Sequence, residues 1–462
     1  MNSTFYLVDR NYNKQIRMPF HCGMAFLFLC RMNYRQTIDY LFSRLPMFSR
    51  IGAAAFKKDL TNALKLCSFL GDPQKRFKSI HVAGTNGKGS VSHMLAAILQ
   101  TAGYKTGLYT SPHLKDFRER IRINGKMVEE EFVIDFTNEI QPLIEEVEPS
   151  FFEITVAMAF KYFAEQKVDI AVIEVGLGGR FDSTNIITPE LSVITNIGWD
   201  HMNMLGDSLD KIAFEKAGII KENIPVVIGE VLPETKDVFQ KIAEEKKAPL
   251  TIASQKRQAV NWSWEKHELI IEVSEQHKTD HKIYHLDLPG IYQTKNLLTV
   301  LESCSQLQQK GWRADETIIQ KALSHAKKLT GLHGRWEVIH HAPDVVLDVA
   351  HNIDGIKQLL EQIEVTSYSQ LHLILGMVKD KEIEKILSIL PNEANYYFTK
   401  AQIPRALPED ELTARARSFG LNGTTFPDVN TALEKAMQQA KKDDLIIVCG
   451  SVFLVGEVKM ST

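Results

Sequence analysis

His81-Val-Ala-Gly-Thr-Asn-Gly-Lys-Gly-Ser90 is the stretch that decides the fold. An apolar run at 80–83 leads into it, and apolar residues at helical spacing follow it: Val91, Leu95, Ile98 and Leu99. A strand, a glycine loop and a helix in that order form the context that a phosphate-binding loop requires. Glycines let backbone N–H groups approach a phosphate, and the start of the helix adds donors and its positive dipole end.

Two side chains of the loop suit phosphate chemistry. Lys88 would reach the outer phosphates as a point charge, and the Ser90 hydroxyl would face the nucleotide or a metal ion. The loop departs from the strict G-x-x-x-x-G-K-[ST] pattern, because Val82 stands where a glycine is usual and Gly89 stands where Ser or Thr is usual. A tight turn that only packs is the alternative, but a lysine directly after Gly87 favours phosphate.

Length and composition bound the function classes. With 462 residues, 44% of them hydrophobic, the chain is long enough for two or three domains, each with its own core. A formal net charge of −3 gives no bulk basic field, so neither nucleic acid nor a membrane is expected as a partner. The five scattered cysteines form no C-x-x-C pair, which predicts reduced thiols in a cytoplasmic protein and no cysteine zinc site.

Residues 1–31 are predicted to lie outside the folded core. The apolar stretch 19–30 is too short to span a membrane, and no convincing small-residue cleavage site follows it. A start codon assigned too far upstream is the preferred explanation, because a good helical pattern begins at Met32. A signal peptide remains the alternative.

The rest of the chain is predicted to form an α/β protein with two domains. In residues 32–330, two helices precede the first strand, apolar strands alternate with helices, and a polar and apolar alternation at 258–286 predicts antiparallel strands. A boundary is expected near 329–334. In residues 331–462 βαβ units resume, with strands near 344–348, 371–375, 395–399 and 444–449 and helices at 353–364 and 380–390, which predicts a second, Rossmann-like domain.

Three polar residues lie at or just beyond predicted strand ends: Ser111, Glu174 and His201. Ligands bind at the carboxyl ends of parallel strands, and a hydroxyl, a carboxylate and an imidazole are possible magnesium ligands. A single loop histidine is more often a surface residue or a cap than a ligand. The convergence of three such residues beside a phosphate loop favours the metal site.

The second domain contributes Arg335 near the boundary and Asp348 at the end of a buried strand. Arg335 could stabilise charge on a transferred phosphoryl group, and Asp348 could accept from a ribose or orient another side chain. An interdomain salt bridge explains both residues equally well from the sequence.

Several motifs together resemble the folylpolyglutamate synthase and dihydrofolate synthase family of the Mur ligase superfamily, over about residues 33–462. These motifs are Gly84-Thr-Asn-Gly-Lys-Gly-Ser90, Ser111-Pro-His-Leu114, Glu119-Arg-Ile121, Glu174-Val-Gly-Leu-Gly-Gly-Arg180, Asp200-His201, Glu215-Lys-Ala-Gly-Ile219, His333-Gly-Arg-Trp336 and Asp348-Val-Ala-His-Asn352. The resemblance implies a central domain of the Mur ligase type, followed by the Rossmann-like domain.

The resemblance also implies an ATP-dependent amide ligase. A carboxylate of dihydropteroate or a reduced folate takes the γ-phosphate of ATP to form an acyl phosphate, and the amine of L-glutamate displaces phosphate. It further implies two magnesium ions and a Lys216 that carbon dioxide converts to a carbamate. A carbamate would turn this cation into a carboxylate-like metal ligand.

The roles implied for individual residues fall into four groups. The triphosphate is held by Gly84, Thr85, Asn86, Gly87, Lys88, Gly89 and Ser90. The magnesium ions are surrounded by Ser90, Ser111, Glu174, His201 and the modified Lys216. ATP is contacted, or the closed site completed, by Asn296, Arg335, Asp348 and His351, and the catalytic set is Lys88, Lys216, Arg335 and His351. The substrate side is lined by Ser111, Pro112, His113, Arg120 and Phe152.

Two alternatives remain open. A peptidoglycan-precursor ligase of the Mur type is the close competitor, although such enzymes usually carry a full UDP-sugar domain before the glycine loop, where this chain has only about 50 credible residues. A non-catalytic P-loop switch has no need for Arg335 and the motif at Asp348. The choice between dihydrofolate synthase, folylpolyglutamate synthase or both stays undecided, and a monomer is expected.

Overall fold

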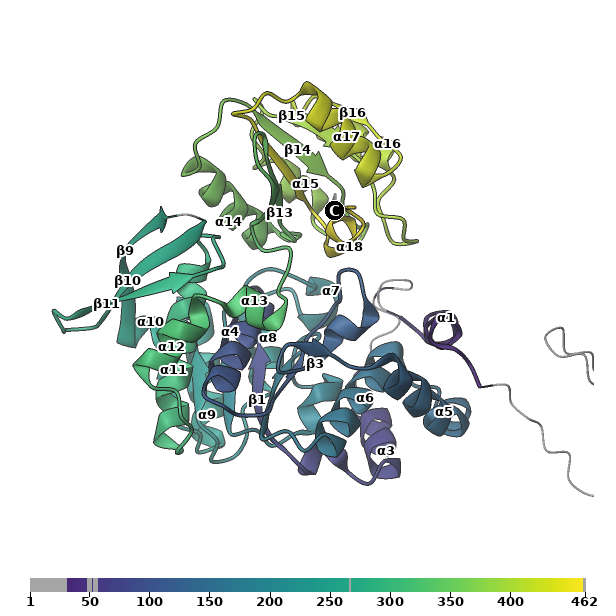
Figure 1. The fold of residues 1–462 in the computed structure, drawn as a ribbon, viewed down its shortest axis with the longest axis vertical. Helices are drawn as coiled ribbons and strands as arrows, with labels where there is room; N and C mark the ends of the chain where they lie inside the picture. Colours follow the sequence, from purple (N-terminus) through teal and green to yellow (C-terminus); the bar gives the residue numbers. More distant parts are fainter. Residues whose placement is uncertain (1–30, 48–51, 53–56, 266, 460–462) are drawn as a thin grey trace, which may run out of the picture.

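The strand β1 (Lys78–Ala83) and the helix α4 (Lys88–Thr101) lie on either side of the glycine loop, as predicted. The structure is a computed structural model that describes residues 31–47, 52, 57–265 and 267–459 (Figure 1). Every residue of β1 after Lys78 is buried, which fits an apolar strand covered on both faces.

The large sheet has eight strands in the order β4-β3-β2-β5-β1-β6-β7-β8, and β2, β5, β1, β6, β7 and β8 run parallel. The short antiparallel strands β3 and β4, which the sequence analysis did not predict, extend one edge. The bounds besides β1 are β2 (Thr106–Tyr109), β3 (Ile121–Ile123), β4 (Lys126–Met127), β5 (Ile170–Glu174), β6 (Leu191–Ile194), β7 (Val226–Ile228) and β8 (Leu250–Ile252).

Helices cover both faces of this sheet, as its buried strands require. One apolar cluster joins the sheet to α4 and to the helices and strands between residues 257 and 332. Another joins it to α1, α3, α5 and α6. The helices besides α4 are α1 (Tyr34–Arg44), α3 (Thr61–Phe69), α5 (Glu130–Val147), α6 (Phe151–Glu165), α7 (Met202–Leu205), α8 (Leu209–Ala217), α9 (Pro233–Glu245), α10 (Ala253–Lys256), α11 (Gln293–Gln309), α12 (Glu316–Leu323) and α13 (Ala326–Thr330), with 3-10 turns η2 (Pro73–Lys75), η3 (Phe117–Arg120) and η4 (Ser183–Ile186).

The antiparallel strands predicted at 258–286 are present. They are β9 (Arg257–Glu265), β10 (Glu268–Glu275) and β11 (His281–Leu286), and they form a separate sheet in the order β11-β10-β9. Leu269, Ile271 and Val273 of β10 are buried against the same apolar cluster as α4. This small sheet therefore belongs to the same core as the glycine-loop helix.

The second large sheet has six strands in the order β12-β13-β17-β14-β15-β16, and Figure 1 shows it above the first sheet. Its strands are β12 (Glu337–His340), β13 (Asp344–Leu347), β14 (Leu371–Leu375), β15 (Asn395–Phe398), β16 (Gly423–Thr425) and β17 (Leu445–Cys449). Its helices are α14 (Ile353–Glu364), α15 (Ile383–Leu387), α16 (Glu409–Arg417), α17 (Val429–Gln439) and α18 (Val452–Gly456).

Three details of this sheet differ from the prediction. The edge strand β12 runs antiparallel to β13, and β16 forms a short parallel strand between two helices. The helix expected over 380–390 is only Ile383–Leu387. The remaining strands and α14 confirm the predicted parallel α/β pattern.

A short link, residues 331–336, joins α13 to β12 and so carries the chain from the elements of the first sheet to those of the second. Three of its residues have left-handed backbone conformations: Gly331 (φ +70°), Gly334 (φ +69°) and Trp336 (φ +47°). Within the described residues, the chain makes this passage once.

The prediction for residues 1–31 falls almost entirely outside the described residues. Arg31 is described, and its guanidinium pairs with Glu131 and Asp135 on α5. Among the described helices, none combines the length and the apolar character needed to cross a membrane.

Candidate active site

A cavity of about 970 Å³ is lined by residues that follow the carboxyl ends of strands in both large sheets. The sequence-predicted site residues all line it: Gly84, Thr85, Asn86, Gly87, Lys88, Gly89, Ser90, Ser111, Pro112, His113, Arg120, Phe152, Glu174, His201, Lys216, Asn296, Arg335, Asp348 and His351. The structure thus brings together residues that lie up to 267 positions apart, counted from Gly84 to His351. Their individual roles stay predictions.

The glycine loop fits closely against its neighbours. At Gly84 (φ +147°) an added Cβ would lie 1.9 Å from Thr195 Oγ1, and at Gly87 (φ +82°) it would lie 2.2 Å from Asn296 Oδ1. Only glycine is accommodated at both positions without rearrangement. The loop is also held by the Asn86 backbone N–H, which donates to Asn196 Oδ1 at 2.9 Å. The first turn of α4 keeps backbone N–H groups without intrahelical partners, as an anion site requires.

Two lysines share one carbonyl oxygen of this loop. Lys88 Nζ donates to the Gly84 oxygen at 3.1 Å, and Lys216 Nζ donates to the same oxygen at 2.8 Å. Burial, together with the nearby Lys88, lowers the pKa of Lys216 from 10.5 to about 7. Burial also lowers the pKa of Lys88, against the attraction of Glu174 and Asp200. Two lysine side chains that meet at one oxygen beside the loop would suit an anionic ligand in the cavity.

Glu174 lies at the end of β5 and is 4% exposed. Its Oε2 accepts the Ser111 backbone N–H at 3.2 Å, and its Oε1 would lie 3.8 Å from a Cβ placed on Gly89. Burial raises the pKa of this carboxyl, while Lys88 and Arg335 oppose the rise. A buried carboxylate directed toward a phosphate loop suits a divalent cation.

The residues predicted around magnesium offer one carboxylate, one imidazole and two hydroxyls besides Lys216. Within the described part of the chain there is no group of three or more His, Cys, Asp or Glu side chains arranged for a metal ion. Magnesium usually takes only one or two protein carboxylates and completes its shell with water and substrate phosphates. The donor set therefore fits magnesium better than a metal held by protein ligands alone.

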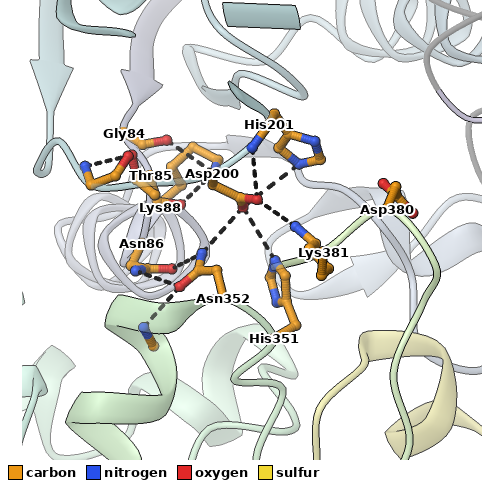
Figure 2. A network of polar contacts seen from close by, with 12 residues as sticks. Gly84, Thr85, Asn86, Lys88, Asp200, His201, His351, Asn352, Asp380 and Lys381 are labelled. Carbon is orange, nitrogen blue, oxygen red and sulfur yellow. Dashed lines mark hydrogen bonds and ion pairs between the residues drawn. The ribbon is translucent and has the colours of Figure 1, made fainter. Parts of the chain in front are cut away.

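Asp200, after β6, is the centre of a polar network between the two sheets (Figure 2). Its carboxylate pairs with Lys381 and accepts from Asn352 Nδ2 at 3.1 Å. The Nε2 atoms of His201 and His351 each lie 3.6 Å from Asp200 Oδ2. Lys381, His351 and His201 hold the pKa of Asp200 well below its usual range in spite of its burial.

A reciprocal amide pair reinforces this junction. Asn86 Nδ2 donates to Asn352 Oδ1 at 3.2 Å, and Asn352 Nδ2 donates to Asn86 Oδ1 at 3.0 Å (Figure 2). Asn352 Oδ1 also caps α14 by accepting the Gly355 backbone N–H at 2.8 Å. The glycine loop of the first sheet is therefore hydrogen-bonded directly to a helix start of the second.

Asp348 is buried and orients the residues around the link. Its Oδ2 accepts from Tyr292 Oη at 2.7 Å and from the Trp336 backbone N–H at 2.8 Å. Arg335 directly precedes Trp336, and its Nη2 would lie 3.4 Å from a Cβ on Gly89. Arg335 thus reaches the phosphate loop from the link. Its guanidinium donates to the His333 and Gly334 carbonyl oxygens, and within the described residues it forms no salt bridge to a carboxylate.

The other end of the cavity is aromatic. The His113 ring stacks on Phe42 with centroids 6.1 Å apart, and its Nδ1 accepts from Arg120 Nε at 2.8 Å. The Arg120 guanidinium lies 5.2 Å from the centre of the Phe151 ring. Burial and Arg120 lower the pKa of His113 to about 3, so this imidazole is neutral at physiological pH. A flat, weakly polar heterocycle would suit this end.

The sequence analysis left three network residues out of the predicted site: Asp200, Asn352 and Lys381. Asp200 and Asn352 lie within quoted motifs, and Asn352 directly precedes a predicted helix, which is the position of an N-cap. Lys381 follows the strand β14 by six residues and belongs to no motif. Its only signal is its place beyond the carboxyl end of a parallel strand.

Comparison with known proteins places the chain among amide ligases. The Mur ligase middle domain family matches residues 82–304, and the Mur ligase glutamate ligase domain family matches residues 334–452. A dihydrofolate synthase/folylpolyglutamate synthase of Bacillus subtilis is 34% identical over 92% of this chain and 98% of its own length. Two solved structures match 92% of this chain over 96% of their own chains. One is Escherichia coli FolC in complex with DHPP and ADP, with a TM-score of 0.79 and 30% identity. The other is Mycobacterium tuberculosis folylpolyglutamate synthase complexed with ADP, with a TM-score of 0.81 and 29% identity.

Proposed function

Since this chain belongs to the dihydrofolate synthase/folylpolyglutamate synthase family of Mur ligases, we propose that it joins L-glutamate to 7,8-dihydropteroate, to reduced folates, or to both, at the expense of ATP. The observation that carries the proposal is the single cavity that holds a phosphate loop and an aromatic end together. A carboxylate bound at the aromatic end could meet the γ-phosphate there. The phosphorylated carboxylate would then react with the amine of glutamate.

In the proposed reaction, the residues of this chain position the reactants and neutralise charge. The glycine loop would bind the triphosphate through backbone N–H groups, while Lys88 and Arg335 would neutralise the charge that moves with the γ-phosphoryl group. Closure of the junction around Asp200 would exclude water from the acyl phosphate. Magnesium, held by Glu174, His201 and the two serines, would supply Lewis acidity toward the phosphate oxygens.

We also propose that Lys216 is carbamylated. Its pKa of about 7 leaves a large share of neutral amine at physiological pH, and the neutral amine is the form that adds to carbon dioxide. The amine nitrogen would bond to the carbon of CO₂ and lose a proton, which replaces a cation by an anion. That change would remove the repulsion between Lys216 and Lys88 and add an oxygen ligand for magnesium.

The remaining expectations extend the proposal. The division into a ligase domain at 32–330 and a Rossmann-like domain at 331–462 is consistent with the two sheets and the link between them. A cytoplasmic location is supported by the described cysteines, Cys67, Cys304 and Cys449, which are free and buried. We propose a monomer that acts on small molecules.

The test is phosphate release by the purified protein with ATP, magnesium and L-glutamate, with 7,8-dihydropteroate and tetrahydrofolate supplied separately and the products identified by mass spectrometry. One added glutamate on dihydropteroate alone would identify a dihydrofolate synthase, and addition to both substrates a bifunctional enzyme. A folded protein that binds ATP but forms neither adduct would contradict the proposal, and UDP-muramyl substrates would be tried next.

A further inference from the structure

We propose that Glu337 is a positioning residue for the ligase reaction, because its carboxylate holds the turn from which Arg335 reaches the glycine loop. This inference rests on the proposed function, in which Arg335 neutralises charge on the γ-phosphoryl group. It adds to that function a residue that directly follows the motif His333-Gly-Arg-Trp336 and lies outside it.

The turn around Arg335 has an unfavourable backbone conformation. Gly334 (φ +69°) and Trp336 (φ +47°), the residues before and after it, both adopt left-handed conformations. Glycine adopts this conformation freely, but for tryptophan it is unfavourable because the Cβ crowds the backbone. Such a conformation persists only where the surrounding structure holds it, and it is found preferentially at functional sites. The turn therefore needs partners that keep it in place.

Two carboxylates hold the turn by the backbone N–H groups of the residues before and after Arg335. Glu337 Oε2 accepts the Gly334 N–H at 2.7 Å, and Asp348 Oδ2 accepts the Trp336 N–H at 2.8 Å. The backbone at Arg335 is thus fixed at both of its neighbours in the chain, which sets the starting point of its side chain.

From this turn the Arg335 side chain reaches the glycine loop, where its Nη2 would lie 3.4 Å from a Cβ on Gly89. Its Nη1 donates to the carbonyl oxygens of His333 and Gly334, at 3.5 and 3.2 Å, and both belong to the same turn. A change in the turn would therefore move the guanidinium relative to the phosphates that the loop is proposed to bind.

The other oxygen of Glu337 connects the turn to the helix before the link. Oε1 accepts from His333 Nδ1 at 2.7 Å and lies 3.0 Å from Lys327 Nζ on α13. Burial raises the pKa of this carboxyl, but these two partners and the Gly334 N–H lower it to about 2, so the carboxyl is ionised at physiological pH. Since Glu337 is the first residue of β12, one ionised side chain joins the helix before the link to the strand after it.

A carboxylate at this position calls for a reason beyond packing. Glu337 is 6% exposed, and a buried carboxylate is stable only among donors, whereas a buried apolar side chain would need none. In the part of the chain that the structure describes, Glu337 is not among the residues that line the cavity. It is therefore placed to act on the reaction through Arg335 and not by contact with a substrate.

The test is a double-mutant cycle in the full chain, with kcat measured at saturating substrates. Arg335→Met should lower kcat about 10³-fold, as the loss of an arginine at a transferred phosphoryl group does. Glu337→Met should lower it about tenfold, because a displaced guanidinium keeps only part of its effect. The combined variant should be no slower than Arg335→Met, since Glu337 then has no guanidinium to position. A further tenfold loss in the combined variant, or an unchanged kcat in Glu337→Met, would overturn the inference.

Two further variants separate positioning from loss of stability. Glu337→Gln keeps an oxygen acceptor for the Gly334 N–H, so it should lower kcat only about threefold, and it carries the cycle if Glu337→Met does not fold. Glu190→Met is the matched control, because Glu190 also pairs with two lysines, Lys78 and Lys310, but lies at the amino end of β6, whereas the cavity follows carboxyl ends. It should lower the melting temperature and leave kcat unchanged. An equal fall in kcat in Glu190→Met and Glu337→Met would overturn the inference.

Failure of the proposed function would be recognised separately, as a wild type that glutamylates neither substrate. Equilibrium binding then tests the inference without turnover, by comparing ADP with the β,γ-methylene analogue of ATP, which alone carries the γ-phosphate. Glu337→Met should weaken binding of the analogue about fivefold and leave ADP binding unchanged. An equal loss for both nucleotides, or no loss for either, would overturn the inference.

Discussion

Around the glycine loop, backbone geometry fixes the site, whereas at the junction between the two sheets a few side chains fix it. Gly84 and Gly87 are enclosed by Thr195 and Asn296, which belong to the first sheet and its helices. The junction, in contrast, forms only when Lys381, His351 and Asn352 of the second sheet reach Asp200 and Asn86 (Figure 2). The backbone of the phosphate loop is thus held by residues of the first sheet and its helices alone, whereas the junction needs side chains from both parts of the molecule.

Lys88→Met tests the phosphate-binding end of the cavity and should have the largest effect on activity. Loss of this cation should lower kcat about 10³-fold, because the charge on the moving phosphoryl group is left without a partner. The melting temperature should not fall, since the variant removes a buried cation whose pKa burial already lowers. Steady-state kinetics and thermal unfolding check both. Lys78→Met, at the exposed start of β1, is the control, and a kcat within tenfold of wild type in Lys88→Met would contradict the role of Lys88.

Lys216→Met should lower kcat about 10²-fold, the usual range when the surroundings of a metal ion are altered. Its stability effect depends on pH. The folded chain releases this proton near pH 7, whereas the unfolded chain keeps it to about pH 10.4. The unmodified lysine therefore destabilises the fold fully below pH 7, and less as the pH rises toward 10.

Without bicarbonate, Lys216→Met should accordingly be more stable than wild type at pH 6, by a margin that narrows by pH 9. Urea unfolding at both pH values measures this, with Lys211→Met on the same helix as the control. Labelled bicarbonate should give a carbamate ¹³C signal in wild type and none in Lys216→Met. A margin that does not narrow between pH 6 and pH 9 would show that Lys216 keeps its proton in the folded chain and would contradict the lowered pKa.

Asp200→Asn tests the junction and should lower kcat/KM about thirtyfold, since misplacement of groups by about 1 Å costs up to 10²-fold. It also leaves the Lys381 ammonium, on a side chain 7% exposed, without its anion, which should destabilise the protein by about 3 kcal/mol. The double variant Asp200→Asn/Lys381→Met should recover the melting temperature without recovering activity. Recovery of both would mean that Asp200 only neutralises a lysine.

Asn352→Ser should have the smallest effect. Serine can still cap α14 but is too short to donate to Asp200 and Asn86, so stability should change by less than about 0.5 kcal/mol while kcat/KM falls about fivefold. Asn352→Ala should lose the same activity and about 1 kcal/mol of stability in addition. Equal stabilities for the two variants would show that the cap contributes nothing.

The sequence predicted the phosphate-binding end of the cavity better than the junction between the two sheets, for physical reasons. Glycine spacing and an apolar strand are local signals, so β1, the loop and α4 follow from neighbouring residues. Asp200 and Lys381, by contrast, are 181 positions apart, and no periodicity links a single lysine to a single aspartate across two sheets. The strands β3, β4, β12 and β16 were missed because they have only two to four residues and also lack the apolar run that marks a buried strand of the same length such as β13.

The link at 331–336 has a consequence for inhibition. Arg335 stands within the link between the two sheets, so a rotation of the second sheet away from the first would carry its guanidinium away from the glycine loop. A small molecule wedged between Leu114 and Gly456 of α18 would hold these two segments apart and withdraw this charge at the same time. Such a wedge would need no likeness to ATP, folate or glutamate, and raising the concentration of any one of them would not displace it by direct competition.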